Sequence, residues 1–253
     1  MRANALAILT LCFALASNAA ENIRLRADLW MPFDGDPAGE KPGYAVEIVR
    51  KIFVPQGITI DFQIMPWGDA LQAANAGEIE GVIGADRSEA ARLVVPTESI
   101  GQYRVGIYAL KTSPWKYENL GSLEKIRLGV QLDYKYWDAL DAYISNHREP
   151  QVIRIGGDNP IEAALAKLKA GEIDALPETE SVFAWAVSDA GYNGADFRTA
   201  FVHEGEGIFI AFASEGGRGA RYARLFDLGM KALRQNGDLR KILARYGQTD
   251  WQK

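Results

Sequence analysis

Cysteine and histidine are scarce in this chain, which has one cysteine, Cys12, and two histidines, His147 and His203. Cys12 lies in an N-terminal segment with the pattern of a cleaved signal, so the exported chain would have no cysteine for a disulfide bond. Neither histidine stands in a metal-ligand spacing, and the sequence has no H-E-x-x-H motif and no acid-rich calcium loop. The sequence therefore predicts no metal, and it offers no Ser-His-Asp nucleophile because neither histidine has a recognisable partner.

Nucleotide loops and long apolar runs are missing as well. Gly205-Glu206-Gly207 and Gly216-Gly217 lack the strand-to-helix context of a phosphate loop and are typical of turns, so no cofactor is predicted. The apolar run 5–16 is shorter than the roughly 20 residues that a membrane span needs. One cation precedes it and small residues follow it, a pattern typical of a secretory signal peptide over residues 1–19. We expect an exported protein without membrane insertion.

Positive charge is also low, since 28 Lys and Arg stand against 33 Asp and Glu, for a net charge of −5. No basic stripe marks a nucleic-acid-binding face, so nucleic acid is not an expected partner. Apolar residues make up 48% of the chain, which is ample for a core, and a chain of this length forms one large or two smaller domains.

One pattern occurs twice, in residues 71–85 and again in residues 165–176. In each copy an amphipathic helix ends at Ala-Gly, where Gly77 and Gly171 supply the left-handed conformation that closes a helix. An acidic-Ile-acidic step then enters a short apolar strand. A repeat at this separation favours two similar α/β lobes, and two lobes imply a cleft between them.

The first lobe is expected to end in the Pro- and Trp-containing connection 112–121. Alternation, periodicity and turn residues predict strands at 23–30, 58–64, 81–85 and 104–111 and helices at 44–53 and 67–76. The polar run 86–92 leaves the carboxyl end of the third strand, which is where ligands sit in α/β sheets.

The second lobe is expected to begin at the strand 127–131. A helix should follow from Tyr134 to about Asn146 with Asp133 as its N-cap. The same reasoning predicts strands at 152–155, 173–176 and 208–213 and helices at 161–170, 178–190, 221–233 and 239–246. With the chain crossing back near 201–207, the predicted lobes are 20–111 plus 205–253, and 112–204.

These features together resemble the family 3 periplasmic solute-binding proteins. The likeness rests on the strand running into Trp-Met-Pro-Phe, Gly43-Tyr44 before a helix, the A-G-E-I-E-G unit with a trailing Arg, and the closing stretch 233–247. The resemblance implies an α/β, two-lobed periplasmic-binding-protein-like fold of type II, with two crossing strands as the hinge. It further implies a periplasmic monomer that captures a small polar, carboxylate-bearing, amino-acid-like solute for the permease of a membrane ABC transporter.

Site residues carry over from the resemblance by position. The ligand aromatic falls on Trp30 and the carboxylate-clamping arginine on Arg92, while the residues that usually donate to the same carboxylate fall on Gly84, Ala85 and Arg87, where backbone amides remain. The second lobe departs from the family pattern. Its Gly-Thr-Thr loop is replaced by 133–135, and the amine-binding Asp would fall on Thr179, between Glu178 and Glu180.

The two arginines suit an anionic ligand, because a guanidinium presents paired donors in a plane that matches a carboxylate. Arg92 is predicted to clamp the ligand, and the alternative is a solvated side chain on the turn 88–92. Arg87 would add a second cation for a diacid, or it points to solvent.

The aromatic and acidic candidates also have two interpretations each. Trp30 and Trp67 are candidate stacking walls of the cleft or core residues, and Tyr134 is a candidate wall or a helix residue facing the core. Glu178 would meet a ligand amine or cation. Glu178 also lies in the first turn of a predicted helix, where a solvated carboxylate would interact favourably with the helix dipole.

Two other functions on this scaffold stay open. Cyclohexadienyl-dehydratase-like members of the family are enzymes, and here Glu178 or Glu180 would protonate the leaving hydroxyl. A binding protein of this type can also serve a sensor. The enzyme alternative stays open because fold alone does not fix function. We expect no enzyme, since no Ser-His-Asp nucleophile set is recognisable.

Overall fold

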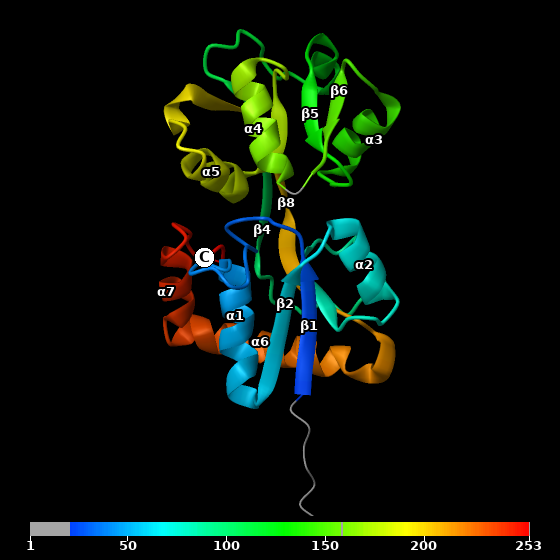
Figure 1. The fold of residues 1–253 in the computed structure, drawn as a ribbon, viewed down its shortest axis with the longest axis vertical. Helices are drawn as coiled ribbons and strands as arrows, with labels where there is room; N and C mark the ends of the chain where they lie inside the picture. The colour runs from blue at the N-terminus through cyan, green and yellow to red at the C-terminus, as the bar shows by residue number, and fades with distance from the viewer. Residues whose placement is uncertain (1–20, 158, 253) are drawn as a thin grey trace, which may run out of the picture.

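The computed structural model describes residues 21–157 and 159–252 and shows two lobes joined by long strands (Figure 1). The signal peptide predicted over residues 1–19 lies outside the described residues. The upper lobe in the view contains α3, α4 and α5, and the lower lobe contains α1, α2, α6 and α7. This arrangement confirms the predicted two-lobed α/β fold class. The exact lobe boundaries stay a prediction.

The first lobe is built on the strands β1 (Glu21–Ala27), β2 (Ile58–Ile64) and β3 (Gly81–Ala85). β1 lies between β2 and β3 and runs parallel to both, and the full sheet has the order β2-β1-β3-β8-β4-β7. The parallel pairs bring the carboxyl ends of β1 and β3 to the same edge. That edge faces the other lobe, so the turns after these strands line the gap between the lobes.

Helices cover the sheet of the first lobe. They are α1 (Tyr44–Phe53), followed by η1 (Val54–Gln56), α2 (Trp67–Asn75), α6 (Gly219–Gln235) and α7 (Asp238–Ala244). α1 buries seven of its ten residues and packs against both C-terminal helices. Gly229 of α6 makes this close approach possible, because a Cβ there would stand 2.6 Å from Ile52 Cγ1. The C-terminal helices therefore complete the lobe in which the chain begins (Figure 1).

Two antiparallel strands, β4 (Gly101–Leu110) and β8 (Phe197–Phe212), run from one lobe to the other (Figure 1). β8 begins at Phe197, well before the predicted start at Ile208. Residues 197–207 of β8 are interrupted by polar residues and by two glycines, so they lack an apolar pattern. Hydrogen bonds to β4 satisfy the backbone of this stretch. This strand pair is the hinge element that the two-lobed fold requires.

The second lobe contains a short parallel pair and three helices. Its elements are η2 (Leu120–Lys125), β5 (Leu128–Gln131), α3 (Asp138–Asn146), β6 (Val152–Ile155), α4 (Pro160–Ala170), β7 (Leu176–Thr179), α5 (Glu180–Asp189) and η3 (Gly194–Asp196). The short turn η4 (Glu215–Gly217) comes after β8 and leads into α6. The repeated helix ends form as predicted, with φ of 73° at Gly77 and 70° at Gly171. The shared Ala-Gly pattern therefore does close a helix in each lobe.

Two element predictions in the second lobe are wrong. α3 begins at Asp138 with Trp137 as N-cap, because Asp133 has a left-handed φ of 63° and the chain stays in a loop through Trp137. The repeat strand begins at Leu176 instead of Ile173 and extends to Thr179, because its backbone pairs with β4 from Val105 to Tyr108. Glu178 therefore lies in a strand and not in the first turn of a helix.

No helix in residues 21–157 and 159–252 has both the length and the apolar character that crossing a bilayer requires.

Candidate functional site

A cleft opens between the two lobes at the carboxyl ends of β1 and β3. It contains about 440 Å³ of non-atom space, including open solvent at its mouth. The lining residues are Asp28, Trp30, Trp67, Gly84, Glu89, Tyr103, Tyr134, Lys135, Tyr136, Glu178 and Thr179. Residues from both lobes and from the crossing strand β4 therefore meet here.

Trp30 is at once a core residue and a wall of the cleft. Its indole is only 6% exposed and stacks on Phe33, with ring centroids 4.4 Å apart and planes 16° from parallel. The turn after β1 fixes this position, because Phe33 N donates to Trp30 O at 2.9 Å and Trp30 N donates to Asp34 O at 3.0 Å. The two interpretations of Trp30 are thus not exclusive, since one face packs on the core and the residue still borders the cleft.

Gly84 brings backbone to the cleft in a conformation that residues with a side chain rarely adopt. The pairing of β3 with β8 shifts register between Ile83 and Ala85, so Gly84 sits in a bulge with φ of 105°. A Cβ at Gly84 would stand 3.7 Å from Trp30 Cε3, an ordinary van der Waals contact, so space does not exclude a side chain there. The left-handed φ disfavours any residue with a side chain there.

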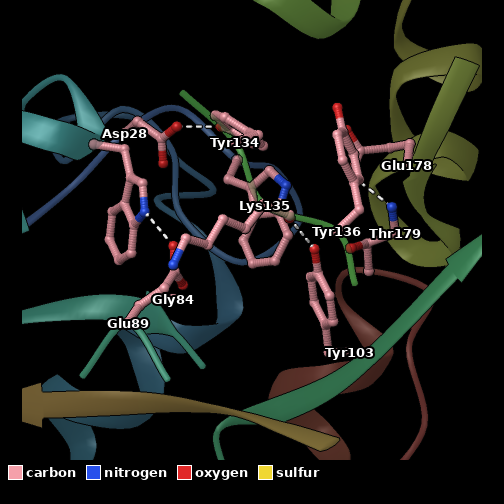
Figure 2. A pocket seen from close by; sticks show the side chains of 11 residues that line it. Asp28, Gly84, Glu89, Tyr103, Tyr134, Lys135, Tyr136, Glu178 and Thr179 are labelled. Carbon is pink, nitrogen blue, oxygen red and sulfur yellow. Dashed lines mark hydrogen bonds between the residues drawn. The ribbon is translucent and has the colours of Figure 1, made fainter. Parts of the chain in front are cut away.

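Side chains of the first lobe reach those of the second across the cleft. Tyr134, in the loop after β5, donates its hydroxyl to the carboxylate of Asp28 at the end of β1. Tyr103 on β4 donates to the backbone carbonyl of Lys135. Figure 2 shows Asp28 and Tyr134 pointing toward one another and Tyr103 reaching the Lys135 backbone. These two bonds hold the lobes together around the cleft.

Glu178 is 2% exposed and lines the cleft from β7. Its carboxylate accepts the backbone N–H of Thr179 at 2.6 Å and a bond from the side-chain amide of Gln131. Burial raises the pKa of Glu178 to about 7, and the Thr179 bond opposes that rise. A carboxyl with this pKa exchanges its proton near neutral pH, which suits it to meet a charged ligand.

Two further carboxyls face the same cleft. Burial raises the pKa of Asp28 to about 6, and the Tyr134 hydrogen bond limits the rise. Burial also raises the pKa of Glu89, which accepts Trp67 Nε1 at 2.9 Å and the backbone N–H of Asp86 at 3.2 Å. Lys135 is the one cationic side chain among the described lining residues. The cleft is therefore aromatic and acidic.

The predicted residues divide into two groups. Trp30, Trp67, Gly84, Tyr134 and Glu178 line the cleft, whereas Ala85, Arg87 and Arg92 do not. Ala85 is fully buried in the packing between β3 and α2. The binding role of each of these residues stays a prediction.

The two arginines lie outside the cleft because of the turn that follows β3. Asp86 Oδ1 accepts the backbone N–H of Glu89 at 2.8 Å, and Asp86 O accepts Ala90 N at 3.1 Å. This tight turn directs Glu89 toward Trp67. Arg87 is exposed with its guanidinium 4.2 Å from the ring centroid of Phe209, and Arg92 is exposed further along the turn. The expected arginine clamp is therefore not part of this cleft.

Several lining residues were missed by the sequence analysis, namely Asp28, Glu89, Tyr103, Lys135 and Tyr136. Asp28 was placed inside the strand predicted over 23–30, whereas β1 ends at Ala27 and leaves Asp28 at the carboxyl end of the strand, where ligands lie in α/β sheets. Glu89 lies within the polar run where a site was expected. The others depend on the packing of one lobe on the other, which no local pattern reveals.

Known proteins resemble this chain in structure but not detectably in sequence. No protein-family model and no curated protein sequence matches it. A histidine kinase sensor domain with similarity to periplasmic binding proteins superimposes with a TM-score of 0.71 at 19% identity, covering 89% of this chain and 95% of that one. An ancestral arginine-binding protein bound to arginine gives 0.70 at 18% identity, covering 89% and 97%.

A third similar structure comes from glutathione import by GshT of Streptococcus mutans. Its TM-score is 0.72 at 15% identity, covering 90% of this chain and 95% of that one. Likeness at such low identity extends to the fold and no further. The chain has the two-lobed fold of the periplasmic binding proteins.

Proposed function

We propose that this protein binds a small polar solute in the interlobe cleft and closes on it by a hinge motion about β4 and β8. The observation that carries the proposal is the cleft itself, in which residues of both lobes and the crossing strand β4 surround one aromatic and polar hollow. The hydrogen bond from Tyr134 to Asp28 supports it, because its two partners lie on opposite lobes and a hinge motion that opened the cleft would separate them.

The ligand residues that we propose are Trp30, Trp67, Gly84, Tyr134 and Glu178. Trp30 and Trp67 supply apolar surface, Gly84 supplies backbone polar groups, and Tyr134 and Glu178 supply side-chain oxygens. Arg92 is not included, because it lies exposed on the turn after β3 and outside the lining.

Transport is the role that we favour. The N-terminal pattern of residues 1–19 supports export to the periplasm, and structures with this fold include the substrate-binding protein of an amino acid ABC transporter. We propose that the monomer passes its solute to the permease of such a transporter. The likeness to a histidine kinase sensor domain supports a sensing role as the alternative.

Native mass spectrometry of the purified protein, paired with small-angle scattering, tests the binding proposal. We expect a retained small molecule, and we expect its removal to increase the radius of gyration as the lobes separate. A protein that retains nothing, gains no thermal stability from any solute class and does not change in size would contradict the proposal.

An acid-catalysed reaction is the second candidate, and Glu178 is the observation that favours it. With a pKa raised by burial to about 7, its carboxyl holds a proton near neutral pH and could protonate a leaving hydroxyl. Incubation with prephenate or arogenate and detection of an aromatic product tests this function. Glu178→Gln should abolish any such product.

A further inference from the structure

We propose that the cleft selects a small organic cation, a protonated amine or guanidine without a carboxylate. This proposal rests on the solute-binding function above and names the class of solute. Asp28, Glu89 and Glu178 face the cleft from three different elements, and Lys135 is the single cation opposing them among the described lining residues. Once ionised, these carboxyls outnumber the lysine and would repel an anionic ligand.

The carboxyls have acceptor capacity left for ligand N–H groups. An ionised carboxylate offers about four lone-pair directions. Glu178 uses its two oxygens for Thr179 N and Gln131, and Asp28 accepts from Tyr134. A protonated amine carries three donors and a guanidinium carries five, so either one can bond to more than one carboxyl at once.

Aromatic rings supply the other half of a cation site. The cleft is lined by five of them, Trp30, Trp67, Tyr103, Tyr134 and Tyr136. The face of an aromatic ring attracts cations, and the attraction is larger in a site from which water is excluded. Figure 2 shows the side chains of Tyr134, Tyr136 and Glu178 gathered around the same space. Acidic and aromatic groups together favour a cation with apolar parts.

A carboxylate on the ligand would have few partners in this cleft. Arg87 and Arg92 are exposed outside it, and the Lys135 side chain is itself exposed at the border. An amino acid would therefore bring its carboxylate close to acidic groups without a guanidinium to pair with it. Removing the carboxylate from such a ligand should improve binding.

Matched pairs of solutes test this directly by titration calorimetry. Agmatine differs from arginine, and cadaverine from lysine, by the carboxylate alone. We expect agmatine or cadaverine to bind at least ten-fold more tightly than its amino-acid partner, and we expect no binding of glutamate. Tighter binding of the amino acids, or no binding of either amine, would overturn the proposal.

Variants of the lining residues provide a second, independent readout. Glu178→Gln should weaken amine binding at least ten-fold, while Glu118→Gln, on an exposed loop of the second lobe, removes the same charge far from the cleft and should leave it unchanged. Lys135→Met should strengthen amine binding, because it removes the opposing cation from an exposed position without disturbing the core. Weaker amine binding by Lys135→Met would also overturn the proposal.

Failure of this proposal can be told apart from failure of the solute-binding function. A thermal-shift screen with neutral and anionic solutes is run beside the amines. Stabilisation by those solutes but not by amines would leave solute binding in place and remove the cation proposal. Stabilisation by none would remove both.

Discussion

Tyr134 of the second lobe donates its hydroxyl to the carboxylate of Asp28 in the first lobe, directly across the cleft. Tyr134 lies in the loop after β5, and Asp28 follows the last residue of β1. The bond therefore joins the two lobes across the cleft. Its strength helps to decide how often the cleft is open.

We expect Tyr134→Phe to shift the ligand-free protein toward an open form. A hydrogen bond to a charged group contributes about 1.5–3 kcal/mol, and phenylalanine keeps the ring while removing the donor. Small-angle scattering should show a larger radius of gyration than for the wild type. Tyr117→Phe, in the connection that leads into the second lobe, is the control, and an equal expansion by both variants would count against a specific bond across the cleft.

Trp30→Ala should lower both stability and affinity, because this indole is 6% exposed and stacks on Phe33. Truncating a buried Trp costs about 3–5 kcal/mol of unfolding free energy. Trp30→Phe should keep most of the packing and still weaken binding, since it reduces the aromatic wall. Chemical denaturation and calorimetry measure the two effects. An unchanged melting temperature for Trp30→Ala would show that the residue is a wall alone.

Arg92→Ala and Arg87→Ala should leave solute affinity unchanged within about 0.5 kcal/mol, because both side chains are exposed outside the cleft. The measurement is calorimetry with whichever solute the wild type binds, with folding checked by circular dichroism. If Arg92→Ala costs 2–5 kcal/mol and Arg92→Lys is already weakened, the arginine clamp implied by the family resemblance operates after all.

Asp34→Asn should stabilise the protein at neutral pH. Asp34 is 1% exposed, and neither carboxylate oxygen has a hydrogen-bond partner among the described residues. Burial, with a contribution from Asp28, raises its pKa well above the usual value. The folded state therefore binds a proton that the unfolded state has lost, so the wild type loses stability as pH rises above about 4.

The size of the effect at Asp34 follows from the same burial. Asn leaves a polar group in the same place but takes up no proton on folding, so we expect a gain of about 1–3 kcal/mol for Asp34→Asn at pH 7 and a much smaller gain at pH 4. Urea unfolding at the two pH values is the measurement. A gain of equal size at both would show that the proton on Asp34 is not the cause.

Cation affinity should rise with pH through about 6 to 7 and level off above. The pKa of Asp28 is raised to about 6 and that of Glu178 to about 7, both mainly by burial, and a bound cation favours the ionised forms. The titratable groups that face them are Glu89, Tyr103, Tyr134, Lys135 and Tyr136. Calorimetry in buffers of different ionisation enthalpy should detect proton release at pH 6. Proton uptake at that pH would contradict the assignment.

Local pattern was sufficient for much of the first lobe. The predicted bounds of α1 (Tyr44–Phe53), β2 (Ile58–Ile64) and β3 (Gly81–Ala85) are those of the structure. Each of these segments has a clear periodicity and ends at glycine, proline or a polar run, so residues a few positions apart determine it. The repeated Ala-Gly helix ends and the two-lobed fold follow from the same kind of signal.

The site depended on contacts that no local pattern contains. Glu178 lies in a buried strand because β7 pairs with β4, and a shift from helix to strand changed its environment from solvent to cleft. Tyr134 is free to reach Asp28 because Asp133 has a left-handed φ that delays α3. In both cases hydrogen bonds between distant segments overrode the local preference.

The sequence by itself determined the two α/β lobes and the strand ends where a ligand site belongs. The tertiary structure alone decided which side chains enter the cleft: the bulge at Gly84 and the turn after it bring in Glu89 and leave Arg87 and Arg92 in solvent. The direction of a side chain depends on register and turn geometry, which pairing with β8 and the packing of the second lobe impose. The spacing of residues along the chain does not reveal the register or the turn geometry.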